Sequence, residues 1–595
     1  MDRAPDLNLA LIGNCQIAAL VDARAAIVWT CLPRLDGDPV FSALLTRAGA
    51  HSGRGVFAVE LADLQHSRQA YVPNTAVVET VLQGRESAVR VTDFCPRLRM
   101  RGRVYRPAMI VRRLEPLSGR PVVSVRLRPT CSYGAGEPRV SLTSHALRFS
   151  DEGQGYRVTT DGSLAAVREE RPFVLDRPLT FVLGDDEPLR QEPGALARSL
   201  LHRTCGYWED WVRSLALPVD YQEAVIRAAI TLKLCSYEDT GAVLAAITTS
   251  IPEAPDSGRN WDYRYCWLRD SWFVVHALNR LGATRTMEAY LQFIDNTHAR
   301  TPVENLQPLY GITGEADVQE HIVTTLEGYR GMGPVRVGNL ACRQAQHDVY
   351  GAIILAAAQV FFDQRLRSGG ASLFRRLERL GERAAACFAL PDAGPWELRE
   401  STAVHTFSAV MCWAGCDRLA GIAGRVGEHE PARRWRARAD DMRQRILEQA
   451  WNARLGAFAG TFGGESLDAT ALLLAELRFI PADDARFIAT VEAIGRALRH
   501  GDLLYRYRQA DDFGVPVTTF TVCAFWYANA LAAIGRMAEA RELFASLLAR
   551  RNHVGLLSED IGLDGQQWGN FPQTYSMVGI IISALRLSRS WEDVV

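Results

Sequence analysis

One short stretch of the chain concentrates residue types that bind polar rings. Residues 260–270 read Asn-Trp-Asp-Tyr-Arg-Tyr-Cys-Trp-Leu-Arg-Asp, with four aromatic rings, two arginines and two acids. Such a mixture forms a poor core because buried charges need partners, and large rings are rarely left in water without a use. Flat rings beside the donors of Arg269 and the acceptors of Asp270 suit a concave site for a polar, ring-shaped ligand. The plainer interpretation is an aromatic helix start with a surface ion pair.

Three further stretches combine aromatic rings, acids and glycines in a similar way. They are residues 326–339, residues 394–400, and residues 555–560 with residues 567–573 downstream. Each lies between segments with a helical pattern. Loops held by a rigid scaffold are where binding and catalytic residues are concentrated. We therefore expect the fold to bring these stretches to face residues 260–270.

The motifs exclude several kinds of chemistry. The chain has no His-Glu-x-x-His run or Cys/His cluster to support a zinc site. The glycine-rich residues 328–338 lack the Lys-Ser/Thr of a phosphate loop, and no Gly-x-Ser-x-Gly elbow supports a serine hydrolase. Aromatic rings with carboxylates fit glycoside chemistry, in which one carboxylic acid protonates the leaving oxygen and a second carboxylate activates water or attacks. Taken singly, each glutamate is more simply a solvated surface group.

The N-terminal third of the chain has the pattern of β-strands. Apolar and polar residues alternate over residues 123–128, the period of a half-buried strand. Short apolar runs of this kind lie between Gly, Pro and Asp turn signals, which predicts an antiparallel β-sandwich over residues 1–190. Residues 29–36, Trp-Thr-Cys-Leu-Pro-Arg-Leu-Asp, are interpreted as a plain connection, with the alternative that they reach a neighbouring domain.

Beyond residue 190 the pattern becomes helical. Residues 191–220 begin with Pro, Gly and charged residues and continue as a helix with Trp208 and Trp211, which we interpret as a helical linker. Residues 221–595 have apolar positions at helical spacing and predict about a dozen helices. No repeat of 20 to 50 residues indicates a solenoid. Helices with long connections between them suit a closed barrel with a site at one end.

Composition narrows the classes of partner and the compartment. The 595 residues carry a formal net charge of −1, so neither nucleic acid nor a membrane surface is expected as a partner. No run is long and apolar enough to cross a membrane. Residues 1–6 lack a secretion signal. The twelve cysteines are scattered without Cys-x-x-Cys pairs, which favours free thiols and a cytoplasmic protein.

The ordered set of motifs resembles glycoside hydrolase family 15, the family of glucoamylases, glucodextranases and bacterial or archaeal trehalases. The matching segments are NWDYRYCWLRD at 260–270, GYRGMGPVRVGN at 328–339, Trp-Glu at 396–397, GLLSED at 555–560 and GNFPQTYSM at 569–577. The resemblance covers nearly the whole chain, because residues 13–36 also resemble the prokaryotic members. It implies an N-terminal antiparallel β-sandwich, a helical linker and a catalytic (α/α)6 helical barrel.

Two carboxyl groups match the catalytic residues of this family. Glu397, after Trp396, matches the general acid, and Glu559 matches the general base that activates water. An acid keeps its proton in an apolar or anionic setting, to which Trp396 could contribute. Because the family inverts, the resemblance implies that the two carboxyl groups lie roughly 6.5–9.5 Å apart. Asp560 is a neighbour that could orient the base or be mistaken for it.

Further matches imply a subsite for the terminal glucose. Arg269 and Asp270 match the pair that grips its hydroxyl groups, and Tyr263 and Trp267 match rings that line it. Trp396 is expected beside them. A second group is expected to brace the mouth of the barrel without touching sugar: Arg336, Asn339, Gln344, Gln346 and Asp348.

Departures from the family pattern concern the side of the site that holds the leaving group. Residues 517–520, Val-Thr-Thr-Phe, stand where many members have Glu-Gly-Ala-Phe. Residues 350–352, Tyr-Gly-Ala, replace the common Tyr-Gly-Glu. The part of the substrate beyond the terminal glucose therefore stays open, and so do the roles of Asp262 and Glu327.

The resemblance implies an exo-acting, inverting hydrolase of α-glucosidic bonds that releases β-glucose without a metal or organic cofactor. Trehalose is the expected substrate, and malto- or isomaltooligosaccharides, as for a glucoamylase or glucodextranase, are the alternative. A disaccharide phosphorylase and a non-catalytic sugar-binding protein are rival classes. Glu559 argues against the phosphorylase, which uses phosphate where a hydrolase uses a carboxylate base. The oligomeric state stays open, and a homo-oligomer is compatible with the sequence.

Overall fold

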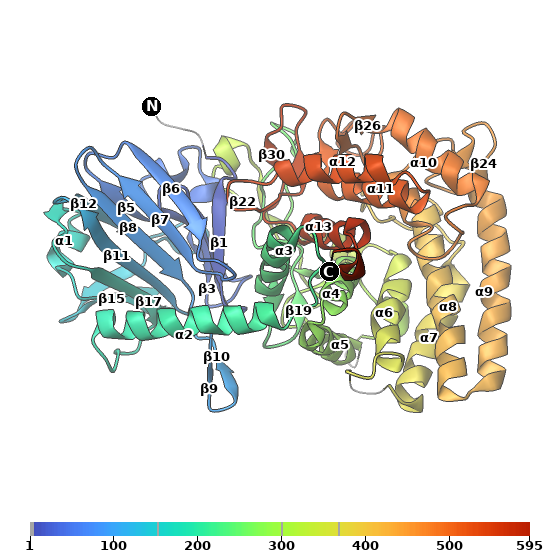
Figure 1. The fold of residues 1–595 in the computed structure, drawn as a ribbon, viewed down its shortest axis with the longest axis horizontal. Coiled ribbons are helices and arrows are strands. Elements are labelled where there is room, and N and C mark those ends of the chain that lie inside the picture. Colours follow the sequence, from blue (N-terminus) through green and yellow to red (C-terminus); the bar gives the residue numbers. More distant parts are fainter. Residues whose placement is uncertain (1–4, 152–153, 299–300, 367–368, 595) are drawn as a thin grey trace.

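The computed structural model describes residues 5–151, 154–298, 301–366 and 369–594. Residues 1–4, which belong to the stretch expected to lack a secretion signal, lie outside these ranges. Two parts lie side by side (Figure 1): β-sheets built from the first part of the chain and helices built from the rest. The expected order of an antiparallel β-sheet domain followed by a helical domain is confirmed.

Two antiparallel sheets face each other in the N-terminal domain. Phe57 and Phe181, one from each sheet, pack edge to face with their ring centroids 5.6 Å apart. The first sheet has the order β1 (Leu9–Gly13), β2 (Ala18–Asp22), β3 (Ile27–Leu32), β5 (Val56–Leu61), β12 (Val122–Arg128), β16 (Phe173–Val174), with β4 (Asp38–Phe41) beside β3. The second has the order β13 (Arg139–Leu142), β14 (Ala146–Asp151), β15 (Gln154–Thr160), β17 (Leu179–Asp185), β11 (Ile110–Ser118), β8 (Ala88–Phe94), β7 (Val78–Gln83), β6 (His66–Tyr71).

The space between the sheets holds apolar side chains and one ion pair. Val123 and Val125 of β12 are fully buried, and Ser124 between them is half-buried, as the alternation in the sequence predicts. Arg112 of β11 and Asp93 of β8 form a fully buried pair 2.7 Å long. The guanidinium of Arg112 also donates to a backbone carbonyl of β5 in the facing sheet at 2.6 Å. This bond supplies the further partner that a buried charge needs and ties the sheets together.

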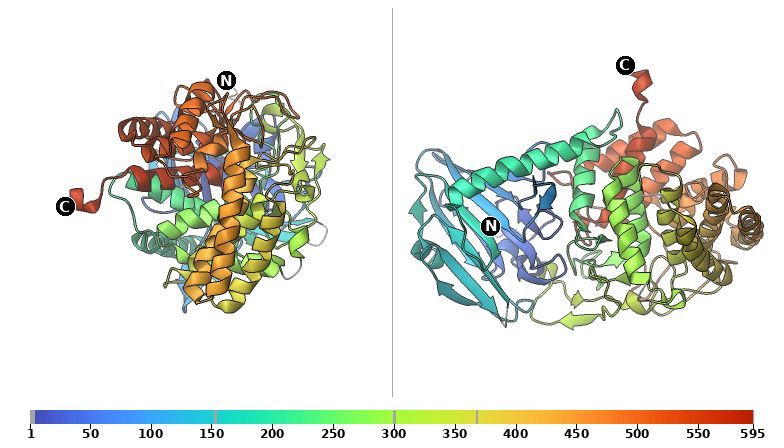
Figure 2. Two further views of the ribbon diagram at one scale, coloured as in Figure 1. Left: turned by 90° about the vertical axis from the view of Figure 1, so that its right-hand side faces the viewer. Right: turned by 90° about the horizontal axis from the view of Figure 1, so that it is seen from below.

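A long helix, α2 (Pro193–Arg213), joins the two domains. The carboxylate of Glu192 caps its start and accepts hydrogen bonds from the backbone amides of Gly194 and Ala195 at 2.8 and 2.6 Å. Proline suits the first helical position because no amide hydrogen is needed there. Figure 2 shows α2 running from the sheets to the helical domain. The buried ring of Trp208 anchors it against the rest of the molecule.

Within the described residues, six segments of the C-terminal domain contact one another in a closed ring. In order around the ring they are α4 (Leu268–Arg280), α6 (Asp348–Ala358), α8 (Thr406–Val426), the 3-10 segment η7 (Ala469–Leu473), α11 (Thr521–Ala533) and α13 (Thr574–Leu587), which returns to α4. Every residue of α6 is buried, as expected for a helix with neighbours on all sides. These helices form the core of the domain.

Six further helices each contact one or two members of this ring. They are α3 (Gln222–Leu234), α5 (Thr284–His298), α7 (Ala371–Cys387), α9 (His429–Ala450), α10 (Ala485–Ala497) and α12 (Met537–Ala549). Helix α9 buries only one stripe, made of Trp435, Ala439, Met442, Ile446 and Ala450. A single apolar stripe at this spacing is typical of a helix with one face in solvent.

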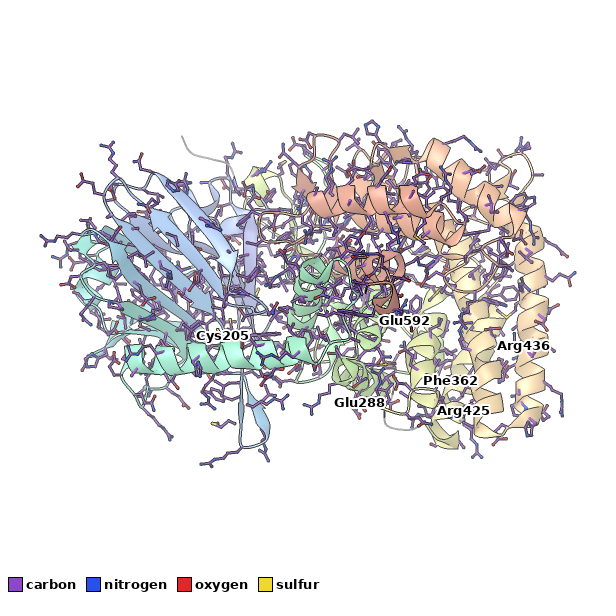
Figure 3. All side chains as sticks on the ribbon, in the orientation of Figure 1. Cys205, Glu288, Phe362, Arg425, Arg436 and Glu592 are labelled. Atoms are coloured by element: carbon purple, nitrogen blue, oxygen red, sulfur yellow. The ribbon has the colours of Figure 1, made fainter. Side chains whose placement is uncertain are left out.

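No disulfide links the cysteines of the described chain, and all of them are buried except Cys205. Cys205 lies half-buried on α2, near the β-sheets (Figure 3). None of the described helices is both long and apolar enough to span a membrane.

Residues 29–36 are more than a plain connection. They begin within β3, and the indole N–H of Trp29 donates to the carbonyl oxygen of Ile247 in the helical part at 2.8 Å. Shortly after them, the carbonyl oxygen of Gly37 accepts a hydrogen bond from Arg264 at 3.0 Å. The sheet domain therefore packs directly on the stretch 260–270, the alternative that the sequence left open.

Candidate active site

A pocket in the helical domain collects its lining from connecting segments that are far apart in the sequence. It takes residues from the stretches 260–270, 326–339, 394–400 and 567–573. The fold thus brings together most of the stretches expected to meet. The predicted site residues among its lining are Tyr263, Trp267, Arg269, Asp270, Trp396 and Glu397. Glu559 is fully buried behind this lining and reaches it through Tyr263.

The candidate acid, Glu397, is held in an unusual backbone conformation. Its φ of 61° lies in the left-handed region, which costs a side-chain-bearing residue about 1–3 kcal/mol and persists only where the surroundings enforce it. Trp396 is anchored by donating its indole N–H to Asp468 at 2.7 Å. The side-chain amide of Gln344 donates to the carbonyl oxygens of Glu397 and Leu398, at 3.1 Å each. Strain of this kind clusters at functional sites.

One carboxyl oxygen of Glu397 collects three donors. Its Oε1 accepts hydrogen bonds from the indole of Trp267 at 2.7 Å, from Gln346 at 3.1 Å and from Arg269 at 3.5 Å. These bonds fix the plane of the carboxyl group and leave Oε2 as the oxygen that can hold a proton. Gln346 was expected to brace the barrel mouth without touching sugar. The structure adds that Gln346 also contacts the candidate acid directly.

Arg269 and Asp270 lie in the first turn of α4 and form part of the pocket lining. Arg269 donates to Gln346 at 2.9 Å and to Asp348 at 3.4 Å, and its Nε lies 3.4 Å from Asp270. Burial raises the pKa of Asp270 to about 7, against the opposing charge of Arg269. Oδ1 of Asp270 accepts no hydrogen bond from the described residues. A buried acceptor at a pocket that receives no hydrogen bond is suited to a hydroxyl group of a ligand.

The candidate base, Glu559, lies just before the short strand β29 (Asp560–Ile561). Its Oε1 accepts the phenolic O–H of Tyr263, and its Oε2 accepts the backbone N–H of Asn570 at 3.3 Å. Burial, followed by the negative charge of Glu253, raises the pKa of Glu559 to about 8, while the bond from Tyr263 and the charge of Arg506 lower it. Tyr263 thus connects this carboxyl group to the pocket.

A glycine makes room for Glu559. Strand β29 pairs with β30 (Gln567–Trp568), and Gly569 follows at a φ of 74°. A Cβ atom on Gly569 would lie 2.6 Å from Cβ and 2.7 Å from Oε2 of Glu559. Both the left-handed φ and this close approach require glycine.

The lining also includes residues that were not predicted from the sequence, among them Glu253, Trp261 and Arg506. The carboxylate of Glu253 pairs with Arg506 at 2.8 Å and accepts the indole N–H of Trp261 at 2.8 Å. Trp261 stood in the opening stretch but was given no role. Glu253 lies seven residues before that stretch, so the only signal was an acid near a recognised motif.

Four more residues were expected to brace the barrel mouth. Two of them line the pocket, and the other two bind residues near it. Asn339 and Gln344 line the pocket. Arg336 pairs with Glu320 at 3.0 Å, and Asp348 accepts a hydrogen bond from Arg269 at 3.4 Å. The positions of these four residues fit a supporting role, and two of them also lie at the pocket surface.

The three acids without an assigned role have structural partners. Asp262 pairs with Arg264 at 2.7 Å, and both are fully buried. Glu327 is exposed and accepts the backbone N–H of Arg47 in the sheet domain at 2.8 Å. Asp560 is buried, accepts one hydroxyl hydrogen bond at 3.2 Å through Oδ1, and leaves Oδ2 without a partner among the described residues.

The parts of this pocket define a class of protein. One oriented carboxyl group at the wall, a second buried carboxyl behind a tyrosine, and an arginine–aspartate pair suited to hydroxyl groups are the parts of a glycoside hydrolase. Within the described ranges no group of three or more His, Cys, Asp or Glu side chains is placed to hold a metal ion. Residues 219–585 match the sequence profile of the glycosyl hydrolases family 15, and the chain belongs to this family.

Relatives resemble the chain along almost its full length. Residues 2–170 match a profile described as trehalase-like, N-terminal. A trehalase of Mycobacterium tuberculosis is 32% identical, over 99% of this chain and 90% of its own length. A trehalase of Thermoplasma volcanium is 31% identical, over 97% of this chain and 93% of its own. A bacterial glucoamylase, solved in complex with acarbose, shares the fold with a TM-score of 0.70 and 12% identity, over 98% of this chain and 94% of its own.

Proposed function

We propose that this glycoside hydrolase is a trehalase, which splits trehalose and water into two glucose molecules. The observation that carries the proposal is the wall of Glu397, Arg269 and Asp270, because it joins a proton donor to a grip for sugar hydroxyls. The substrate rests on relatives that are named trehalases and align over nearly all of the chain. A glucoamylase- or glucodextranase-type hydrolase of malto- or isomaltooligosaccharides is the alternative.

Hydrolysis proceeds by one displacement in this account. Glu397 donates the proton on Oε2 to the glycosidic oxygen as the bond to the anomeric carbon breaks. Glu559 takes a proton from the water that attacks the opposite face of the same carbon. Because the attack is from the opposite face, the configuration inverts and β-glucose forms. The two carboxyl groups are expected roughly 6.5–9.5 Å apart, which leaves room for that water.

The terminal glucose is held by the buried part of the pocket. Arg269 and Asp270 bind its hydroxyl groups, and the rings of Tyr263, Trp267 and Trp396 line its faces. Three of these residues also touch one of the two carboxyl groups. Tyr263 donates to Glu559, and Trp267 and Arg269 donate to Glu397. Binding the glucose therefore completes the packing around both groups.

We further propose the domain division and the setting of the enzyme. The sandwich takes residues 1–190, the helical linker residues 191–220, and an (α/α)6 barrel residues 221–595. The closed ring of contacts, with one set of helices inside and another outside, supports the barrel. Free thiols fit the cytoplasm as the site of action.

A substrate panel tests this function. Purified protein is incubated with trehalose, maltose and isomaltose, with and without phosphate, and the products are separated by chromatography. Trehalose should be hydrolysed at the highest kcat/KM, with glucose as the only product in both buffers. Faster cleavage of maltose or isomaltose would favour the alternative. Glucose 1-phosphate in the phosphate buffer would establish a phosphorylase, and no cleavage of any substrate would establish a binding protein.

A further inference from the structure

The carboxyl group of Glu253 also faces the pocket and has no place in the two-carboxyl mechanism. Glu253 is 4% exposed and belongs to the lining. Both of its oxygens are engaged: Oε1 accepts the indole N–H of Trp261 at 2.8 Å, and Oε2 accepts a guanidinium N–H of Arg506 at 2.8 Å. Trp261 and Arg506 are themselves lining residues. One side chain thus fixes two parts of the pocket wall.

The backbone places Glu253 next to the candidate base. The carbonyl oxygen of Pro252 accepts the backbone N–H of Gly569 at 2.8 Å, and Gly569 lies directly against Glu559. From the other side, the carbonyl oxygen of Trp261 accepts the side-chain amide of Asn570 at 2.8 Å. The segments that carry Glu253 and Glu559 are therefore locked together through residues 569–570.

Arg506 depends on Glu253 for its position. It is 7% exposed, and its Nε has no hydrogen-bond partner among the described residues. Its guanidinium lies 5.4 to 5.9 Å from the ring centroids of Tyr507, Phe520 and Trp396. Rings attract a cation but do not fix its orientation as a carboxylate does.

We propose that Glu253 is a positioning residue of the reaction, which holds Arg506 and Trp261 in the pocket wall and keeps a negative charge beside the candidate base Glu559. This inference rests on the proposed function, because it needs Glu559 to act as the base. A base beside a negative charge holds its proton more firmly and is therefore a stronger proton acceptor. Glu253 would act on the attacking water through Glu559, without touching it.

The charged and polar groups around Glu559 determine in which direction its pKa would change. Its carboxyl group is faced by the O–H of Tyr263, the N–H of Asn570 and the cation of Arg506, all of which lower its pKa, and by Glu253, which raises it. Asp560 lies beside them, and burial with the charge of Glu253 raises its pKa well above the usual range.

Two further groups act on Glu253 from the neighbouring connection. Arg259 is paired with Asp511 at 2.8 Å, and Tyr507 donates to the same aspartate at 2.5 Å. Both groups are therefore engaged with Asp511. Loss of the charge at Glu253 would lower the pKa of Glu559 directly, and would also free Arg506 to lower it further.

The test compares pH–rate profiles of Glu253→Gln and Glu253→Asp with that of the wild type, using trehalose. Glutamine keeps the shape and removes the charge, so the acidic limb of kcat/KM should move to lower pH by about one unit. Aspartate keeps the charge and shortens the reach, so the limb should stay in place while kcat/KM falls about tenfold. A limb that stays in place in a folded Glu253→Gln protein would overturn the proposal.

Controls separate this result from loss of fold and from failure of the proposed function. Asp93→Asn removes another buried partner of an arginine, in the sheet domain, and should lower the melting temperature without moving the limb. If Glu253→Gln does not fold, the test rests on Glu253→Asp. An unchanged kcat/KM in that variant overturns the proposal. If Glu559→Gln keeps wild-type activity, the assigned base is wrong. If Glu559→Gln is inactive but the acidic limb of Glu253→Gln coincides with that of the wild type, the proposed role of Glu253 is refuted. The proposed function is then unaffected.

Discussion

At the scale of single residues, the two candidate catalytic carboxyl groups have different surroundings. Glu397 is part of the pocket wall and has one oxygen held by three donors. Glu559 is buried, and both of its oxygens accept hydrogen bonds. The first arrangement leaves the other oxygen of Glu397 clear of these three donors. The second holds the carboxyl group of Glu559 behind Tyr263.

Removing each carboxyl group should have effects that depend on the leaving group. Glu397→Gln should lower kcat/KM for trehalose about 10²–10⁴-fold, yet leave hydrolysis of α-glucosyl fluoride within about tenfold, because fluoride is a weak base that departs without a donated proton. Glu559→Gln should lower both rates, because both need an activated water. Steady-state kinetics on the two substrates measure this, and equal losses in Glu397→Gln would remove its assignment as the acid.

Glu559 should also affect how the stability of the folded protein depends on pH. Its folded pKa is raised to about 8 from an ordinary value of 4.5, so between these values the folded protein binds the proton more tightly than the unfolded chain. The stability that this proton contributes is present below pH 4.5 and is lost as the pH rises toward 8. The gain in melting temperature of Glu559→Gln over the wild type should therefore be larger at pH 8 than at pH 5. A gain that shrinks with rising pH would contradict the raised pKa.

At the scale of elements, the short strands β29 and β30 and the turn after them position the base. Gly569→Ala would place a methyl group 2.6 Å from Cβ of Glu559, so kcat/KM should fall by about tenfold or more as the carboxyl group is displaced. Gly565→Ala is the matched control. Its φ of 84° gives similar backbone strain, but its methyl group would meet only the far end of the Arg550 side chain, at 3.0 Å. Circular dichroism melts with kinetics distinguish the two, and equal activity in both variants would show that the contact with Glu559 is unimportant.

The elements were easier to predict than the contacts between them. The alternation around Val123 and the helical spacing in α4 are local, so the strand and the helix could be identified from the sequence. The contact of Trp267 with Glu397 spans 130 positions, and that of Tyr263 with Glu559 spans 296. These pairs were proposed as members of one site only because the motifs resembled a family. Nothing local distinguished Gln346, which touches the acid, from its neighbours.

The role of Glu253 was even harder to predict from the sequence than these contacts. It lies in an ordinary Ile-Pro-Glu sequence, and its importance comes from Arg506 and Gly569, which follow it by more than 250 positions. A residue whose role depends on charge at a distance carries no pattern of its own. The sequence could therefore name the two carboxyl groups of the family but not Glu253.

At the scale of the whole molecule, the sheet domain supports the site directly. Arg264, in the stretch that carries Tyr263, is fully buried and donates to Tyr133 of the sheet domain at 2.9 Å and to Gly37 at 3.0 Å. It also pairs with Asp262 at 2.7 Å. The stretch that carries Tyr263 and Trp267, which contact Glu559 and Glu397, is therefore held in place by contacts with the sheet domain.

The two domains should therefore unfold together. Scanning calorimetry of the wild type should show one transition. Tyr133→Phe, which removes one hydrogen bond to a buried charge at a cost of about 1.5–3 kcal/mol, should lower the temperature of that transition without splitting it. Two separate transitions in the wild type would show that the interface is too weak to couple the domains.

The central claim is that a water activated by Glu559 attacks from the face opposite to the bond that Glu397 protonates. The most direct test is ¹H NMR of trehalose hydrolysis, with spectra recorded before the anomers of glucose interconvert. The attacked glucose should appear as the β anomer and the departing glucose as the α anomer, in equal amounts at the earliest times. Release of the α anomer alone would mean retention of configuration, and would contradict this account of the two carboxyl groups.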